Sequence, residues 1–143
     1  MRRLLPVALG ALAFVPAATA GGTTNPCVLV NSNDATTALG SKAGKGKAQT
    51  LGLYKACTYT SGKKTLTVLV RSIATKAAFE KSAKANPGPV LQLPGIGDDA
   101  FSAAAGSTLL VWKSGIEITF TFVGTSPVVQ TQKDLATAAI ARL

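Results

Sequence analysis

The clearest pattern in the chain is a strict alternation of apolar and polar residues near its C-terminal end. In residues 116–123 every second position is apolar: Ile116, Ile118, Phe120 and Phe122. The positions between them are polar and are expected to face solvent: Glu117, Thr119 and Thr121. Because successive side chains of a β-strand point to opposite faces of the sheet, this alternation predicts a strand with one buried face. Residues 65–71 repeat the pattern, with an apolar face made by Leu66, Val68 and Val70.

Three more runs predict strands, and short turn sequences separate them. The runs are residues 50–60, 101–105 and 108–113. The turn dipeptides are typical of hairpin connections and are Ser61-Gly62, Gly106-Ser107 and Ser114-Gly115. Five strands or so, joined this way, favour an antiparallel sheet. Residues 91–101 are expected to be a loop-rich crossing between the two groups of strands.

Helical spacing and cap residues predict three helices, at residues 35–39, 75–85 and 129–143. Gly40 is expected to end the first helix, which follows three residues with capping side chains, Ser32, Asn33 and Asp34. The predicted order is helix, two strands, helix, three strands, helix. We therefore expect a single α+β domain over residues 21–143, in which helices cover one face of an antiparallel sheet of about five strands.

The first twenty residues carry the three-part signature of a secretory signal peptide. Met1-Arg2-Arg3 is basic, residues 4–15 are apolar, and Ala18-Thr19-Ala20 is a cleavage site with small residues at both ends. The apolar stretch is well short of the ~20 residues that span a bilayer. We expect cleavage after Ala20, export by the general or the twin-arginine route, and no transmembrane segment in the mature chain.

Cys27 and Cys57 are the only cysteines of the chain. In an exported protein such a pair favours a disulfide, which here would staple a small domain. A zinc site is one alternative, but the chain has no histidine and only two thiols to offer. Lipid attachment at Cys27 is the other, although Pro26 and a polar spacer separate this residue from the apolar run.

The absence of histidine removes several classes of active site. Serine–histidine and cysteine–histidine machinery are excluded, and the commonest metal ligand is missing. Asp98 and Asp99 are the only adjacent carboxylates, and the favoured interpretation is a turn acid that caps backbone amides. The lysine and glycine loop at residues 41–47 fails the P-loop pattern, because Ser41 and Ala48 occupy two required positions. We expect no catalytic residue, no cofactor and no metal site.

Positive charge is concentrated in one segment. The chain has 15 lysines and arginines against 6 acidic residues, and without Arg2 and Arg3 a formal charge of +7 remains. Six lysines and no acid lie in residues 42–64: Lys42, Lys45, Lys47, Lys55, Lys63 and Lys64.

These lysines are interpreted in two ways. If the loop and the hairpin turn meet at one end of the sheet, a positive patch for an anionic partner forms there, made of Lys42, Lys45, Lys47, Lys63 and Lys64. Nucleic acid is not expected as the partner, because interleaved aromatic residues and arginines are missing. The alternative interpretation is that the lysines only solubilise the surface.

Several short motifs resemble those of the small secreted proteins and lipoproteins of unknown function that are common in actinobacteria. They are Pro26-Cys27-Val28-Leu29-Val30, Ala38-Leu39-Gly40, Cys57-Thr58-Tyr59, the run from Leu93 through Gly95-Ile96-Gly97-Asp98-Asp99-Ala100 to Phe101, and a closing helix from Leu135 to Leu143. The resemblance implies an exported α+β domain with a disulfide between a helix and a strand, and it implies no catalytic residues. The chain departs from many such proteins because it lacks a lipid-attachment cysteine.

Together these features predict an exported, non-enzymatic domain that binds a partner at the cell envelope or outside the cell. The expected partner is a protein or an anionic component of the envelope. The alternative function is an inhibitor or modulator of a secreted enzyme, in which the braced sheet presents its loops to the target.

Overall fold

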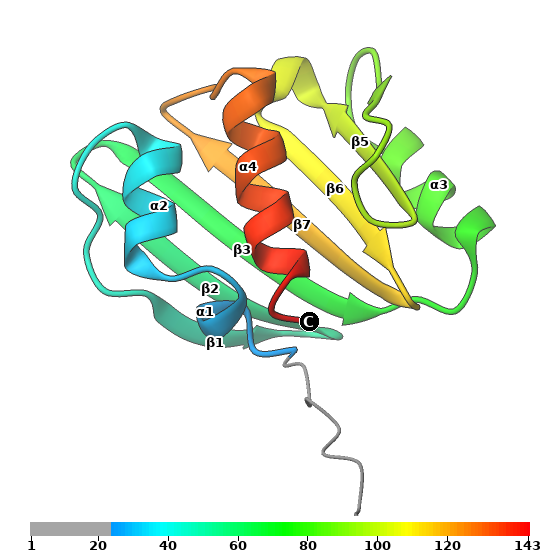
Figure 1. The fold of residues 1–143 in the computed structure, drawn as a ribbon, viewed down its shortest axis with the longest axis horizontal. Coiled ribbons are helices and arrows are strands. Elements are labelled where there is room, and N and C mark those ends of the chain that lie inside the picture. The colour runs from blue at the N-terminus through cyan, green and yellow to red at the C-terminus, as the bar shows by residue number, and fades with distance from the viewer. Residues whose placement is uncertain (1–23) are drawn as a thin grey trace, which may run out of the picture.

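Seven antiparallel strands form one sheet in the computed structural model, which describes residues 24–143 (Figure 1). The expected signal peptide and its cleavage site lie outside these described residues. Along the chain the strands are β1 (Lys47–Leu51), β2 (Tyr54–Ser61), β3 (Lys64–Ser72), β4 (Leu91–Gln92), β5 (Asp99–Ala103), β6 (Thr108–Lys113) and β7 (Ile116–Val123). Their order across the sheet is β1-β2-β3-β7-β6-β5-β4, so the edges are β1 and β4.

Helices lie on both faces of the sheet, and not on one face as the sequence suggested. One face is covered by α1 (Pro26–Leu29), α2 (Ser32–Leu39) and α4 (Val129–Ile140) (Figure 1). Helix α3 (Lys76–Lys84) packs on the opposite face, where the Phe79 ring contacts Phe101 and Trp112. A single 3-10 turn, η1 (Ala104–Gly106), joins β5 to β6. The architecture is α+β, as predicted.

The main core lies between the sheet and the three helices on its first face. The predicted apolar faces of β3 and β7 are confirmed, because six of their seven residues are buried there and pair across the strands, as Val68 does with Phe120. The seventh, Ile116, is half-buried. Leu39 from α2 and Leu135 from α4 close the core from above. Burial of large apolar side chains contributes roughly 1.5–3 kcal/mol each, so this layer is the main source of stability.

Three predicted segments differ from the observed elements. Residues 50–60 are not one strand, because Gly52, with φ +60°, and Leu53 turn the chain between β1 and β2. This turn and the two-residue strand β4, within the predicted crossing, raise the strand count from about five to seven. Strand β5 ends at Ala103, since the next two alanines have positive φ.

The first long helix begins three residues earlier than predicted. The Asn31 side chain caps α2 by accepting hydrogen bonds from the backbone amides of Asn33 and Asp34. The Asp34 carboxylate accepts one from the Asn31 amide in return, which completes a capping box. Gly40 ends the helix in the left-handed conformation, with φ 69°, as expected.

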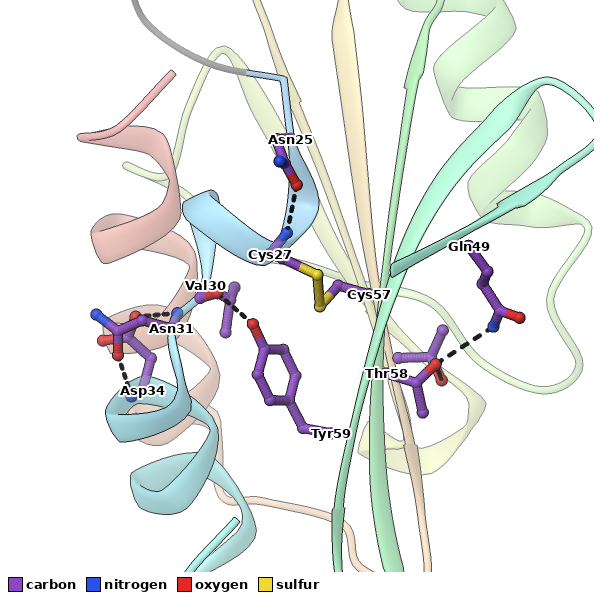
Figure 2. The surroundings of a disulfide bond; sticks show 10 residues. Asn25, Cys27, Val30, Asn31, Asp34, Gln49, Cys57, Thr58 and Tyr59 are labelled. Carbon is purple, nitrogen blue, oxygen red and sulfur yellow. Dashed lines mark hydrogen bonds between the residues drawn. A yellow bond between two sulfur atoms is a disulfide. The ribbon is translucent and has the colours of Figure 1, made fainter. Parts of the chain in front are cut away.

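A disulfide between Cys27 and Cys57 fastens α1 to β2, and this confirms the predicted pairing (Figure 2). Next to it, the Tyr59 hydroxyl donates a hydrogen bond to the Val30 carbonyl. Both contacts lie in the main core, where Cys57 and Tyr59 are buried. They hold the short N-terminal helices against the second strand of the sheet.

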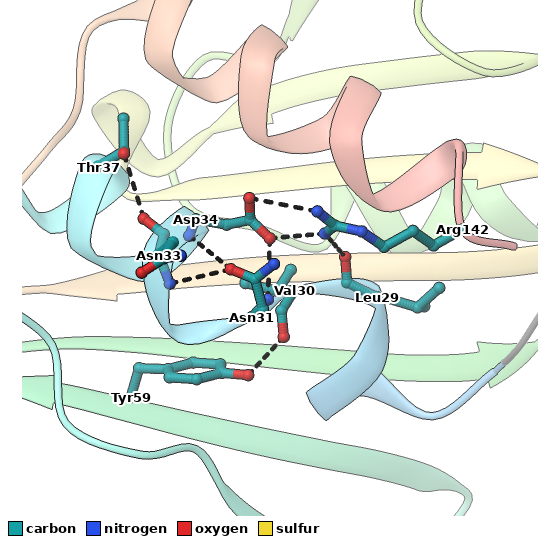
Figure 3. A network of polar contacts seen from close by, with 8 residues as sticks. All are labelled: Leu29, Val30, Asn31, Asn33, Asp34, Thr37, Tyr59 and Arg142. Atoms are coloured by element: carbon teal, nitrogen blue, oxygen red, sulfur yellow. Dashed lines mark hydrogen bonds and ion pairs between the residues drawn. The ribbon is translucent and has the colours of Figure 1, made fainter.

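Arg142 ties the end of the chain to the same N-terminal helices (Figure 3). Its Nη1 donates to the Leu29 carbonyl and to Asp34 Oδ2, each at 2.6 Å. Asp34 therefore caps α2 and also forms an ion pair with the segment that follows α4. Charge-assisted hydrogen bonds of this kind are stronger than neutral ones.

Removing the disulfide is expected to lower the free energy of unfolding by roughly 3–4 kcal/mol, because the bond closes a 30-residue separation in the unfolded chain. The test is urea unfolding of the native protein and of a variant with Cys27→Ala and Cys57→Ala. Equal unfolding free energies would show that the tether does not stabilise the fold.

High pH is expected to destabilise the protein through Tyr59. Burial, helped by the nearby Asp34 carboxylate, raises the pKa of its phenol, although Arg142 opposes this. A raised pKa in the folded state gives a contribution to stability that is complete below pH ~10 and is lost as the pH rises further. The stability advantage over Tyr59→Phe should therefore shrink above pH ~10 in urea unfolding, and a constant difference would contradict this.

Candidate functional site

The loop after α2 and the hairpin turn between β2 and β3 meet at one end of the sheet. The Gly44 amide donates to the Thr60 carbonyl at 3.0 Å, and the Ser61 hydroxyl donates to the Lys42 carbonyl at 2.8 Å. Ser41 and Ser61 also share a hydrogen bond between their hydroxyls. The loop and the hairpin turn thus lie at the same end of the sheet, which is the arrangement that the predicted positive patch requires.

We call this region of the chain the lysine end, and it comprises Lys42, Lys45, Lys47, Lys63 and Lys64. Lys47 pairs with Thr58, so its side chain lies on the sheet face opposite the one that α2 covers. Four of these side chains are exposed, and among the described residues they form no ion pair. The fifth, Lys64, is half-buried, and its ammonium donates to the Leu39 carbonyl at 2.9 Å. Since that carbonyl lies at the negative end of α2, Lys64 stabilises the helix and is the least available of the five.

Acidic residues are paired elsewhere and do not neutralise the lysine end. Five of the six acids form ion pairs with Arg71, Lys76, Lys113 or Arg142. The sixth, Asp134, accepts a hydrogen bond from Gln130 on the exposed side of α4. The acidic side chains are thus paired with other residues of the fold. The four exposed lysines, in contrast, face solvent without an ion-pair partner among the described residues.

Lys55 does not belong to the lysine end. It lies on β2 opposite Thr50, five residues before Thr60, a separation of about 17 Å along a strand. It borders a groove of about 400 Å³ beside the edge strand β1. The groove is lined by Asn25, Pro26, Ala48, Gln49, Thr50, Lys55 and Ala56.

The adjacent carboxylates Asp98 and Asp99 bind different partners and differ in burial. Asp98 is exposed and accepts the Ser114 amide at 2.7 Å, so it caps the turn between β6 and β7 as the sequence suggested. This hydrogen bond, and a second from Lys113, lower the pKa of Asp98. Asp99 is instead buried on β5, where its carboxylate accepts from Gln92. The two acids do not form a shared site.

Glu117 was expected to face solvent, and this prediction is wrong. Only 1% of its surface is exposed, because Arg71 covers it with hydrogen bonds of 3.1 and 3.2 Å. Arg71 also donates to Ser82 of α3 and lies over the Tyr54 ring, 4.8 Å from its centroid. Helix α3, whose packing on this face was not anticipated, holds the Arg71 side chain through Ser82. We interpret the Arg71–Glu117 ion pair as a structural contact that supports the fold.

The position of the lysine loop depends on a glycine. A Cβ atom at Gly46 would lie 2.6 Å from Cys57 Sγ and 2.7 Å from the Tyr59 ring, whereas one at Gly44 would meet only the Thr60 carbonyl, at 3.7 Å. Close packing at position 46 therefore sets the path of residues 41–46 along the end of β2.

Substitution Gly46→Ala should lower the free energy of unfolding by about 1–3 kcal/mol through overpacking. Gly44→Ala is the matched control and should stay within about 0.5 kcal/mol of the native protein. Urea unfolding of both variants measures the difference. Equal effects would show that the loop is not fixed by its contact with the disulfide.

The described residues offer no other assembled chemistry at this site. Within residues 24–143, no group of three or more cysteine, aspartate or glutamate side chains is placed to hold a metal ion. None of the helices in the same range has the length and apolar character needed to cross a membrane. Comparison of the chain with family models, curated proteins and solved structures gives no match.

Proposed function

We propose that this protein is an exported, non-enzymatic binding module whose lysine end holds an anionic partner at the cell envelope or outside the cell. The observation that carries the proposal is the joining of the loop to the hairpin turn by the Gly44–Thr60 and Ser61–Lys42 hydrogen bonds. These bonds bring together lysines that are separated in sequence. The disulfide fits export, since such bonds persist outside the reducing cytosol.

The charges of the lysine end suit a partner that carries several negative groups. Two ammonium groups about 10 Å apart in water repel each other by only about 0.4 kcal/mol, so the fold can hold the cluster easily. Exposed ion pairs are individually weak, at about 0.2–1 kcal/mol each. A polyanion that contacts four lysines adds these contributions, whereas a single small anion does not.

The loop that carries two of the lysines is held in place by several contacts, which favours binding. The loop at residues 41–46 is held by β2 through Thr60 and Ser61 and by α2 through the Ala43 amide, which donates to the Thr36 hydroxyl, and Gly46 packs against the disulfide. A surface that is ordered before binding loses less conformational entropy when the partner arrives. Lysine ammonium groups bind anions as point charges, so the chemistry available here is recognition of negative charge.

The test is binding of inorganic polyphosphate to the disulfide-bonded protein, measured by isothermal titration calorimetry. The variant Lys45→Ala with Lys47→Ala should bind about fivefold more weakly than the native protein, since two exposed ion pairs are lost. The control is Lys81→Ala with Lys84→Ala on α3, which removes the same charge far from the lysine end and should change the affinity by less than about twofold.

Salt provides an independent check on the same interaction. The affinity for polyphosphate should fall steeply between about 50 and about 300 mM sodium chloride, because exposed charges are screened over a few ångströms at high ionic strength. Salt-independent binding, or equal losses in the two double variants, would overturn the proposal and leave the lysines a solubilising role.

A further inference from the structure

The two edges of the sheet are protected to different extents. Strand β4 has only two residues and lies between Pro89 and Pro94, and short strands flanked by proline resist pairing with other chains. Strand β1 has five residues, all exposed, without a proline. Its first residue, Lys47, is charged, and the other four residues of the strand are uncharged. Within residues 24–143, the β1 edge is therefore the one open to another strand.

The outward main-chain groups of β1 are identified by the hairpin that joins it to β2. A two-residue turn, Gly52-Leu53, connects the strands, and the pair next to it is Leu51 and Tyr54. Hydrogen-bonded pairs alternate along an antiparallel ladder, starting at the pair that closes such a turn. Ala48 and Thr50 thus direct their N–H and C=O groups away from β2, toward the free edge.

Positive charge lies at both ends of this edge. Lys45 and Lys47 stand where β1 begins, and Lys55 lies opposite Thr50 near its other end. Between them, Ala48 and Thr50 line the groove of about 400 Å³ that Lys55 borders. An added strand could form hydrogen bonds with the outward main-chain groups of Ala48 and Thr50. Its alternate side chains could enter the groove, and lysine ammonium groups would lie toward each of its ends.

We propose that β1 binds an extended acidic segment of a partner protein, which pairs with its free edge as an eighth strand. This inference rests on the proposed function and names the partner class for the edge strand that begins at the lysine end. Pairing with an exposed edge is an established mode of peptide recognition, in which main-chain hydrogen bonds give affinity and alternate side chains give specificity. Charge decides between occupants, because a second copy of this chain would bring a second set of lysines.

The probe is a capped synthetic nonapeptide of alternating glutamate and threonine, and its binding is measured by calorimetry. Thr50→Pro removes an outward N–H and no charge, and proline is tolerated on the solvent side of an edge strand. Thr50→Ala keeps the N–H and is the matched control. We expect Thr50→Pro to weaken peptide binding about tenfold, Thr50→Ala to change it by less than about twofold, and both to bind polyphosphate like the native protein.

A second arm keeps the test decisive if Thr50→Pro does not fold. The native protein is titrated with the same peptide carrying N-methyl groups on alternate amides, which keeps its charge and blocks strand pairing. A loss of about tenfold supports the inference. Equal binding of both peptides would overturn it while leaving the proposed function intact. A dimer in sedimentation that Thr50→Pro dissociates would also overturn it, since a second copy would then occupy the edge.

Failure of the proposed function would give a different result from failure of strand pairing. In that case Lys45→Ala with Lys47→Ala changes neither polyphosphate nor peptide binding. If only the strand-pairing inference fails, Lys45→Ala with Lys47→Ala still weakens polyphosphate binding.

Discussion

The attachment of the N-terminal segment to strand β2 is the constraint on which the rest of the structure depends. The disulfide fixes α1 to Cys57, and Tyr59 holds the Val30 carbonyl two residues further along the strand. The same strand then receives the loop through Thr60 and Ser61. One strand thereby positions the helices over the core and the lysines at its end.

In this arrangement the acidic residues and the exposed lysines have different roles. Acidic groups serve the framework: Asp34 caps a helix and pairs with Arg142, and Glu117 lies buried beneath Arg71. The four exposed lysines of the lysine end have no such partner among residues 24–143. A solubilising role does not require that a lysine-bearing loop and a lysine-bearing hairpin turn be joined at one end of the sheet, and this joining is what favours a binding role.

Features encoded by local sequence were predictable. The alternations in β3 and β7 and the left-handed Gly40 need only neighbouring residues to specify them, and they were found as expected. The split between β1 and β2 was missed, although Gly52 within the apolar run could have indicated the turn. The burial of Glu117 was beyond local patterns, because its partner Arg71 lies 46 residues away and α3 packs on the second face. For the site, the sequence named the lysines, but only the fold could show that Lys64 is engaged and Lys55 lies apart.

Nuclear magnetic resonance tests the central claim, that the lysine end is the binding surface, most directly. The ¹⁵N-labelled protein is titrated with inorganic polyphosphate and the amide shifts are followed residue by residue. The structure predicts that residues 41–47 and 60–64 shift first and furthest, while the amides of α3 (Lys76–Lys84) stay in place. Shifts centred on α3, or spread evenly over all basic residues, would contradict the claim.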